Sequence, residues 1–225
     1  MYTYQYPHAA LTTDCVVFGF DGKQLSVLLI KRGLEPYKGK WALPGGFMRM
    51  DETVEQCALR ELKEETGVAD IYVEQLQAFS GLGRDPRERV VTVAFMAFVR
   101  QEDYHVVGGD DADQAQWFPV TETPELAFDH REILIVALEK LRWKIAYEPL
   151  AFRLLNEEFT MTHVQTIYEA VLGQKFDRRN FHKKMTALGY IIPTGNTTGG
   201  SGRPAATYAF DEAKYRAMVA SKNVI

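Results

Sequence analysis

The sequence GFMRMDETVEQCALRELKEETGV, which runs from Gly46 to Val68, contains the pattern that decides the fold. Thr53 and Gln56 are spaced as a helix-capping box, in which the side chain of each residue reaches the backbone of the other. Gly67 is a typical C-terminal stop, because glycine adopts the left-handed conformation at low cost. We therefore expect a helix from Thr53 to Thr66.

The predicted helix carries acidic residues on the face that should be buried. At about 100° per residue, Val54, Cys57 and Ala58 form an apolar stripe that should face the core. Three glutamates continue this stripe within an arc of roughly 100°, namely Glu61, Glu64 and Glu65. Mutual repulsion of the three carboxylates would cost roughly several kcal/mol, which a hard divalent cation (Mg²⁺ or Mn²⁺) removes. A solvated acidic face on a helix that ends early is the alternative.

The whole segment resembles the box of the Nudix hydrolase family, G-x5-E-x7-R-E-U-x-E-E-x-G-U, in which U is aliphatic. The matching residues are Gly46, Glu52, Arg60, Glu61, Leu62, Glu64, Glu65, Gly67 and Val68. With average residue usage, chance agreement at one starting point is on the order of 10⁻⁹. The resemblance extends from Thr12 to Leu141 when flanking strands are included. It implies an α/β (α+β) Nudix fold, in which a mixed sheet lies between helices.

The resemblance also implies roles for individual residues. Glu61, Glu64 and Glu65 would be catalytic residues that bind the metal ion directly or through its waters. Glu52 and Arg60 would form the ion pair that fixes the loop against the helix.

Further segments resemble the ADP-ribose-directed branch of this family. They are WALPGG at Trp41–Gly46, GLGRDPRERVV at Gly81–Val91 and LAFDH at Leu126–His130. The expected substrate-binding residues are therefore Gly45, Gly46, Arg84, Arg87 and Arg89. Guanidinium groups suit phosphates, although an ordinary charged turn would have the same composition as the arginine-rich loop. The expected ligand is ADP-ribose or a related nucleoside diphosphate.

A general base is harder to identify from the sequence. The loop from Gln101 to Ala115 carries five acidic residues, Glu102, Asp103, Asp110, Asp111 and Asp113, and one of them could serve. Such acidic runs are more often only solvated.

The overall composition is that of a globular protein of the cytoplasm. Of the 225 residues, 46% are hydrophobic and 25% are charged, close to globular averages. Both cysteines, Cys15 and Cys57, fall at apolar positions and are expected to be buried thiols in a reducing compartment. Residues 1–14 lack the pattern of a secretory signal, and no run of 18 apolar residues occurs, so we expect no membrane association.

The charge distribution divides the chain into two parts. Residues 146–225 carry 10 basic and 7 acidic residues, whereas residues 1–145 carry 16 basic and 23 acidic residues. An acidic part suits a metal site, and a basic part suits a polyanionic partner. The change follows a helical run from Arg131 to Lys144. We therefore expect a Nudix-like domain over residues 1–145 and a second domain over residues 146–225.

The second part has the layout of a winged helix-turn-helix. Thr162 and Gln165 predict a capping box for one helix, which Gly173 ends. Asp177 predicts the cap of a second helix, which should bury Phe181, Met185 and Leu188. The segments Tyr190–Pro193 and Ala205–Phe210 have the composition of two strands around a glycine-rich loop.

The second helix should present a basic face to solvent. The residues expected to bind DNA are Arg178, Arg179, Asn180, His182, Lys183 and Lys184, with Arg203 in the wing. Such side chains donate hydrogen bonds to phosphates and base edges. A basic helix that merely solubilises a small domain is the alternative.

The combination resembles the Nudix-related transcriptional regulators. That family includes repressors that sense ADP-ribose and a sister branch that senses L-arabinose. We expect a homodimer that binds a double-stranded DNA operator. Regulators of this type often have eroded boxes, whereas this chain keeps all three glutamates, so we expect that hydrolysis is retained.

Two alternatives remain. One is a pyrophosphohydrolase whose C-terminal part serves dimerisation or binds another protein. The other is an arabinose-responsive repressor, for which a neutral pentose gives no reason to keep three metal-binding carboxylates.

Overall fold

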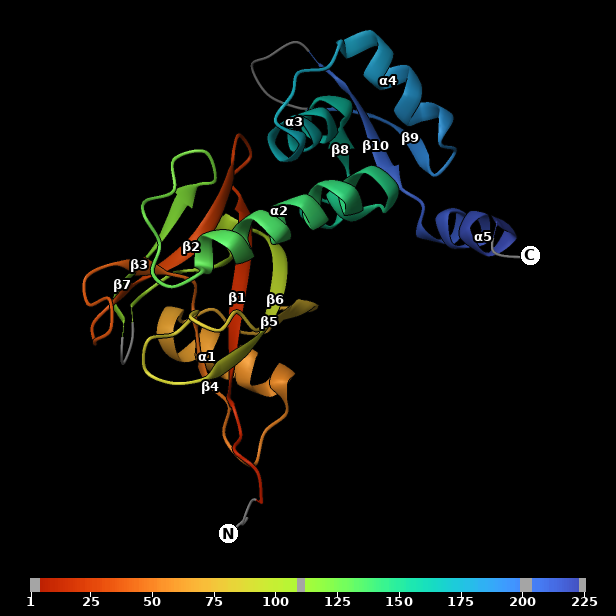
Figure 1. Ribbon diagram of the computed structural model, residues 1–225. Coiled ribbons are helices and arrows are strands. Elements are labelled where there is room, and N and C mark those ends of the chain that lie inside the picture. Colours follow the sequence, from red (N-terminus) through yellow and green to blue (C-terminus); the bar gives the residue numbers. More distant parts are fainter. Residues whose placement is uncertain (1–4, 109–111, 199–203, 223–225) are drawn as a thin grey trace. The chain divides into compact units, whose positions relative to one another are not determined.

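The computed structural model describes residues 5–108, 112–198 and 204–222 (Figure 1). The chain divides into two compact units, Met1–Asp21 with Leu25–Leu141 and Gly22–Gln24 with Arg142–Ile225. The division falls inside helix α2 (His130–Tyr147). The expected boundary after residue 145 lies in the same helix and stays a prediction. No helix of the described residues is long and apolar enough to cross a membrane.

A mixed sheet organises the first unit. Within the described residues its strands are β1 (Ala10–Phe20), β2 (Leu25–Arg32), β3 (Trp41–Ala42), β4 (Gly45–Phe47), β5 (Glu74–Phe79), β6 (Val90–Arg100) and β7 (Ala112–Pro119). The strand order is β3-β2-β1-β6-β5, with β4 also paired to β1 and β7 to β2. β1 and β6 run parallel over their whole length, and the other pairs are antiparallel. The expected mixed sheet is confirmed.

Strand β1 places helices on both faces of this sheet. Cys15 packs in one core cluster with Ala58 and Leu62 of α1 (Val54–Thr66). The neighbouring Asp14 approaches His130, the first residue of α2, with 3.4 Å between Oδ1 and Nε2. Successive side chains of a strand point to opposite faces, so α1 and the start of α2 cover opposite faces. The short 3₁₀ helix Gln101–Asp103 follows β6.

Helix α1 has the ends that the sequence predicts. Thr53 accepts a hydrogen bond from the backbone N–H of Gln56, whose side chain accepts one from the backbone N–H of Thr53. Gly67 ends the helix in the left-handed conformation, with φ 74°. Cys15 and Cys57 are buried free thiols, as expected.

The second unit has two helices followed by a hairpin, as the winged helix-turn-helix layout predicts. Its elements are the 3₁₀ helix Leu150–Leu154, β8 (Phe159–Thr160), α3 (Met161–Leu172), α4 (Arg178–Ala187), β9 (Ile191–Thr197), β10 (Ala206–Phe210) and α5 (Glu212–Lys222). The sheet is antiparallel, with order β8-β10-β9. Phe152 stacks on Phe210, with 4.8 Å between ring centroids. Neither β8 nor α5 was predicted from the sequence.

The start of α3 differs from the prediction. The cap of α3 is Thr160, which accepts from the backbone N–H of His163, and not Thr162. The side chain of Gln165 instead donates to Glu169 and to the carbonyl of Phe176, so no capping box forms. The capping-box prediction was wrong because β8 pairs with β10 through Thr160, which fixes where the extended chain ends.

Burial in α4 also differs in part. Phe181 and Met185 are buried as expected, but Leu188 is 38% exposed. The helix ends at Ala187, and Leu188 is its C-terminal cap residue at the surface.

The position of the α3 cap gives a test of the second unit. We expect Thr160→Ala to lower the free energy of unfolding by about 1 kcal/mol, because an orphan N–H of α3 loses its acceptor. Thr162→Ala is the matched control and should be near neutral, since Thr162 is exposed and alanine favours a helix. Urea unfolding followed by circular dichroism measures both. A larger loss of unfolding free energy for Thr162→Ala than for Thr160→Ala would mean that Thr162 caps α3, as the sequence pattern suggests.

Candidate functional site

The glutamates of α1 line a pocket of about 620 Å³ in the first unit. Glu61, Glu64 and Glu65 form one wall of this pocket, and the backbone of Gly45 and Gly46 faces them. Glu65 is buried and accepts a hydrogen bond of 2.8 Å from the backbone N–H of Gly45. The helix and the preceding loop therefore bring these five expected site residues together.

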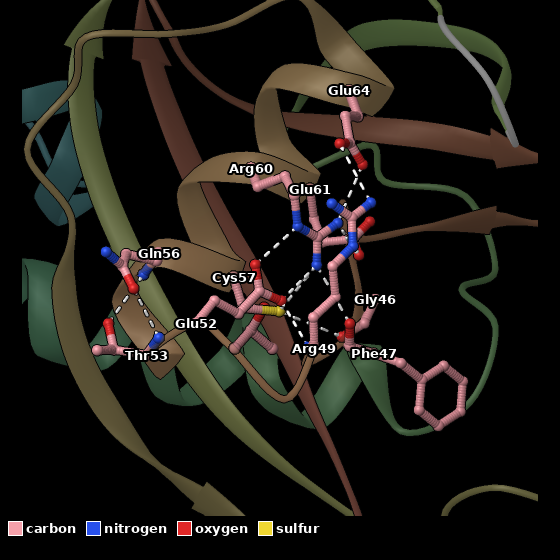
Figure 2. Close-up of polar contacts among 11 residues, drawn as sticks. Gly46, Phe47, Arg49, Glu52, Thr53, Gln56, Cys57, Arg60, Glu61 and Glu64 are labelled. Carbon is pink, nitrogen blue, oxygen red and sulfur yellow. Dashed lines mark hydrogen bonds and ion pairs between the residues drawn. The ribbon is translucent and has the colours of Figure 1, made fainter. Parts of the chain in front are cut away.

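Arg60 connects the loop to the helix. Its guanidinium donates two hydrogen bonds to Glu52, from Nε at 2.8 Å and from Nη2 at 2.6 Å. Nη1 donates to Glu61 at 2.6 Å and to Glu64 at 3.0 Å, so Arg60 lies between these carboxylates (Figure 2). The hydrogen bonds from Arg60 lower the pKa of Glu52 to about 2. Glu52 and Arg60 thus form the ion pair that the resemblance implies.

Close packing explains the glycine that begins the box. A Cβ atom added at Gly46 would stand 2.5 Å from the carboxylate carbon of Glu61. A larger residue would therefore displace Glu61 from its place between Gly46 and Arg60. The exposed ring of Phe47 points away from this cluster in Figure 2.

The electrostatics of the pocket suit a cation. Burial raises the pKa of Glu65 to about 8, against the effect of the N–H of Gly45. Burial also raises the pKa of Glu61. The charge of Glu61 adds to the cost of ionising Glu65, and the charge of Glu64 adds to the cost of ionising Glu61, which an oxygen-binding divalent ion would remove.

The carboxylates are not gathered around one point, however. Among the described residues no group of three histidine, cysteine, aspartate or glutamate side chains is arranged to hold a metal ion. Arg60 holds Glu61 and Glu64, whereas Glu65 is bonded to Gly45. Carboxylate oxygens are the ligands that Mg²⁺ or Mn²⁺ prefers. To bind such an ion together, Glu61 and Glu64 would have to leave Arg60, and Glu65 would have to turn from Gly45.

A buried ionic cluster lies at the other side of the pocket, which three of its members, Asp14, Arg84 and His130, line. Arg84 donates to both carboxylate oxygens of Asp129, at 2.9 and 2.8 Å, and to Asp14 at 3.2 Å. His130 accepts a hydrogen bond of 2.9 Å at Nδ1 from the backbone N–H of Leu43. Its neutral ring therefore carries the proton on Nε2, which faces Asp14. Burial lowers the pKa of His130, which favours this neutral form.

No individual roles were predicted from the sequence for Asp14, Asp129 or His130. A charged residue inside the apolar strand TTDCVVF was the available signal for Asp14. Asp129 and His130 stood out only as part of the segment LAFDH. Their partners lie far away in the sequence, so spacing alone does not reveal the cluster.

The arginines of the predicted phosphate-binding loop have different environments. Arg84 lines the pocket but is already paired with two carboxylates. Arg87 lines the pocket, pairs with Asp85, and lies 4.9 Å from the centroid of the Phe47 ring. Arg89 is exposed, donates to the carbonyl of Gly81, and is not among the described residues that line the pocket.

The acidic loop after β6 contributes no described residue to the pocket. Asp103 pairs with Arg100 at 2.9 Å. Asp110 and Asp111 lie outside the described residues, as does the side chain of Asp113.

Helix α4 presents the expected basic surface in the second unit. The side chain of Asp177 caps it by accepting from the backbone N–H of Asn180. The exposed residues are Arg178, Arg179, Asn180, Lys183 and Lys184. His182 is half-buried, with its Nε2 3.0 Å from the hydroxyl of Tyr208 on β10. Arg203 lies outside the described residues.

A groove of about 1030 Å³ runs beside this surface. It is lined by residues at the starts of α3 and α4 and by residues 204–206 and 208, at and just before the start of β10. Its lining residues include Arg178, Arg179, Asn180, His182 and Tyr208. His182 therefore links the helix to the hairpin and does not project freely into solvent. The basic helix and the hairpin form one continuous surface within the second unit.

Comparisons with known proteins match both units. The model of the NUDIX domain matches residues 8–136, and that of the NrtR DNA-binding winged helix domain matches residues 151–210. The chain is 34% identical to the ADPR responsive transcriptional repressor NtrR of Acinetobacter baylyi, over 91% of this chain and 83% of that protein. It is 40% identical to the ADP-ribose pyrophosphatase of Methanocaldococcus jannaschii, over 62% of this chain and 77% of that protein.

Solved structures agree with this assignment. NrtR of Shewanella oneidensis, crystallised with a 27mer DNA, is 33% identical, with a TM-score of 0.71 over 89% of this chain and 93% of that one. The NUDIX domain of the same protein, crystallised with ADP ribose, is 37% identical, with a TM-score of 0.55 over 60% of this chain and 90% of that one. The chain therefore belongs to the Nudix family, and within it to the proteins in which an NrtR-type winged helix domain follows the Nudix domain.

Proposed function

We propose that this protein is a transcriptional regulator whose Nudix domain binds ADP-ribose and whose winged helix domain binds an operator. The single observation that carries the proposal is the presence of both surfaces in one chain. An intact acidic box lines a pocket in the first unit, and a basic helix beside a hairpin lies in the second. Relatives named for ADP-ribose and for DNA binding support each half.

The chemistry of the pocket supports a nucleoside diphosphate as the ligand. One wall is acidic and suits a metal-bound diphosphate, through Glu61, Glu64 and Glu65. The opposite side offers Arg87 beside the rings of Phe47 and Phe128, where a planar group can stack. A neutral pentose has no diphosphate to bind at the acidic wall and no planar group to stack beside Arg87, so L-arabinose is the weaker candidate.

Retained hydrolysis is part of the proposal. Mg²⁺ or Mn²⁺, when bound, would polarise the diphosphate and lower the pKa of a bound water. Glu61, Glu64 and Glu65 would hold the ion after Glu61 and Glu64 exchange their hydrogen bonds from Arg60 for the metal. The box has lost none of its fixed residues, and the similarity to the pyrophosphatase of Methanocaldococcus jannaschii supports catalytic competence.

Hydrolysis gives the first prediction for this site. We expect Glu64→Gln to slow release of AMP from ADP-ribose by about 100-fold or more, because the amide cannot carry the charge that holds the ion. Glu55→Gln is the matched control, since Glu55 is an exposed residue of the first turn of α1. Chromatography of the nucleotides measures both variants. If the wild type released no AMP at high protein concentration with Mg²⁺ or Mn²⁺, we would conclude that the domain binds its ligand without hydrolysing it.

The exposed face of α4 supports DNA binding by a helix in the major groove. In a twofold symmetric dimer, one such helix would meet each half-site of a palindromic operator. Arg178, Arg179, Lys183 and Lys184 supply the charge, and Asn180 can read a base edge. His182 is bonded to Tyr208, so it would orient the hairpin against the helix.

Operator binding tests this assignment. Changing Arg179 and Lys183 together to alanine should weaken binding by about 2–4 kcal/mol, and the salt dependence should become shallower by about 0.9 for each phosphate that the variant no longer neutralises. Lys214→Ala with Arg216→Ala on α5 removes the same charge from exposed ion pairs elsewhere in the second unit. Fluorescence anisotropy at several salt concentrations compares the two. Equal weakening by both double variants would mean that net charge alone, and not α4, governs binding.

The response to ligand tests the whole proposal. We expect ADP-ribose to weaken operator binding by about 5- to 150-fold, the usual size of coupling between sites. By reciprocity, the operator should weaken ADP-ribose binding by the same factor. The titration is done without metal or with Glu64→Gln, because hydrolysis would consume the ligand. Release by L-arabinose alone would assign the chain to sugar sensing, and release by neither would leave a hydrolase with an unexplained second unit.

A further inference from the structure

We propose that the ion pair between Arg84 and Asp129 couples occupancy of the Nudix pocket to helix α2, and through α2 to the DNA-binding unit. This coupling rests on the proposed function and identifies the residue that carries its regulation. Asp129 is the positioning residue in this scheme.

The first step is the placement of Asp129 outside the pocket wall. Arg84 lines the pocket, and its side chain is only 5% exposed. Asp129 holds Arg84 by two parallel hydrogen bonds, yet it is not among the described residues that line the pocket. A ligand in the pocket can therefore meet Arg84 directly and affect Asp129 only through Arg84.

The second step is the connection of Asp129 to α2. Asp129 directly precedes the helix, and its carbonyl accepts from the backbone N–H groups of Glu132 and Ile133 in the first turn. The next residue, His130, does line the pocket and is held by the backbone N–H of Leu43. The start of α2 is therefore fixed to two parts of the pocket wall, the Arg84 loop and the segment before Gly45.

Helix α2 contains residues of both units. α2 continues without a break from His130 to Tyr147, and its residues from Arg142 onward belong to the second unit. There Arg142 donates from Nε to the carbonyl of Val171, close to the end of α3. Ile145 is fully buried. A change at the first turn of a continuous helix is thus passed to residues that pack within the winged helix domain.

Competition for Arg84 supplies the driving force. Its guanidinium is shared between Asp14 and Asp129, so one arginine serves two carboxylates in this buried cluster. A diphosphate in the pocket offers a further anionic partner to the same guanidinium. Binding of the diphosphate then weakens the ion pair between Arg84 and Asp129. The ligand therefore has a higher affinity for one of two positions of the start of α2 than for the other. Such a preference is the requirement for any coupling between sites.

Asp129→Asn tests the inference in the full-length protein without metal. The amide keeps the shape and the ability to accept a hydrogen bond, but it loses the charge. We expect Asp129→Asn to bind ADP-ribose at least as tightly as the wild type does, because the ligand no longer competes with the charge of Asp129 for Arg84. We expect the effect of ADP-ribose on operator binding to fall from about 5- to 150-fold towards onefold.

Glu132→Gln is the matched control. It removes one negative charge from the first turn of the same helix, but Glu132 is exposed, and within the described residues the carboxylate partners of Arg84 are Asp14 and Asp129. The control variant should respond to ADP-ribose like the wild type. An unchanged response in Asp129→Asn, or an equal loss of response in Glu132→Gln, overturns the inference, as does loss of ADP-ribose binding itself in Asp129→Asn. A wild type without any response overturns the proposed regulation as well.

Hydrogen exchange of the wild type gives a second measurement that needs no variant. With saturating ADP-ribose, we expect amide protection to change in the first turn of α2 and also in residues 142–147. A change confined to the pocket loops, with none in residues 142–147, overturns the inference even if ADP-ribose releases the operator.

Discussion

The pocket of the first unit depends on the guanidinium of Arg60. One side chain joins the loop residue Glu52 to the helix residues Glu61 and Glu64, which otherwise would repel one another. Hydrogen bonding from Arg60 lowers the pKa of Glu52 from 4.5 to about 2. The contribution of this pair to stability is therefore complete above about pH 4.5 and is lost as the pH falls towards 2. Over the neutral range the ion pair between Arg60 and Glu52 therefore does not vary with pH.

Strand β1 sets the rest of the geometry, because its alternate side chains serve two different purposes. Cys15 and Val17 pack with α1, which carries the acidic box, whereas Asp14 anchors Arg84 and faces His130. A shift of one residue in the pairing of β1 would turn Cys15 and Val17 away from α1 and Asp14 away from Arg84 and His130. Both sets of contacts would then be lost. The acidic-box side and the α2 side of the first unit are thus held in a fixed relation by one strand.

Prediction from the sequence works best where the structure depends on local pattern. Helix α1 and its caps follow from spacing within about twenty residues, and so does the cap of α4 at Asp177. The Arg60–Glu52 pair was expected from the resemblance to the family box. Features that depend on distant partners were predicted wrongly or were missed. Thr162 has the spacing of a cap, but pairing of β8 with β10 selects Thr160. For Arg84 the expected role in substrate binding stays a prediction, and the sequence pattern did not reveal its two carboxylate partners, which lie 70 and 45 positions away.

The parallel pairing of β1 with β6 has a consequence for the order of folding. Ala10 pairs with Val90 and Phe20 with Arg100, so the centre of the sheet joins segments that are 80 residues apart. Closing so long a loop costs entropy that only non-local contacts repay. During synthesis the β1–β2 hairpin and α1 can form early, but β1 gains its neighbour on the other side only after β6 has left the ribosome. Until then that edge is an unpaired apolar strand, the part of the nascent chain most exposed to wrong association.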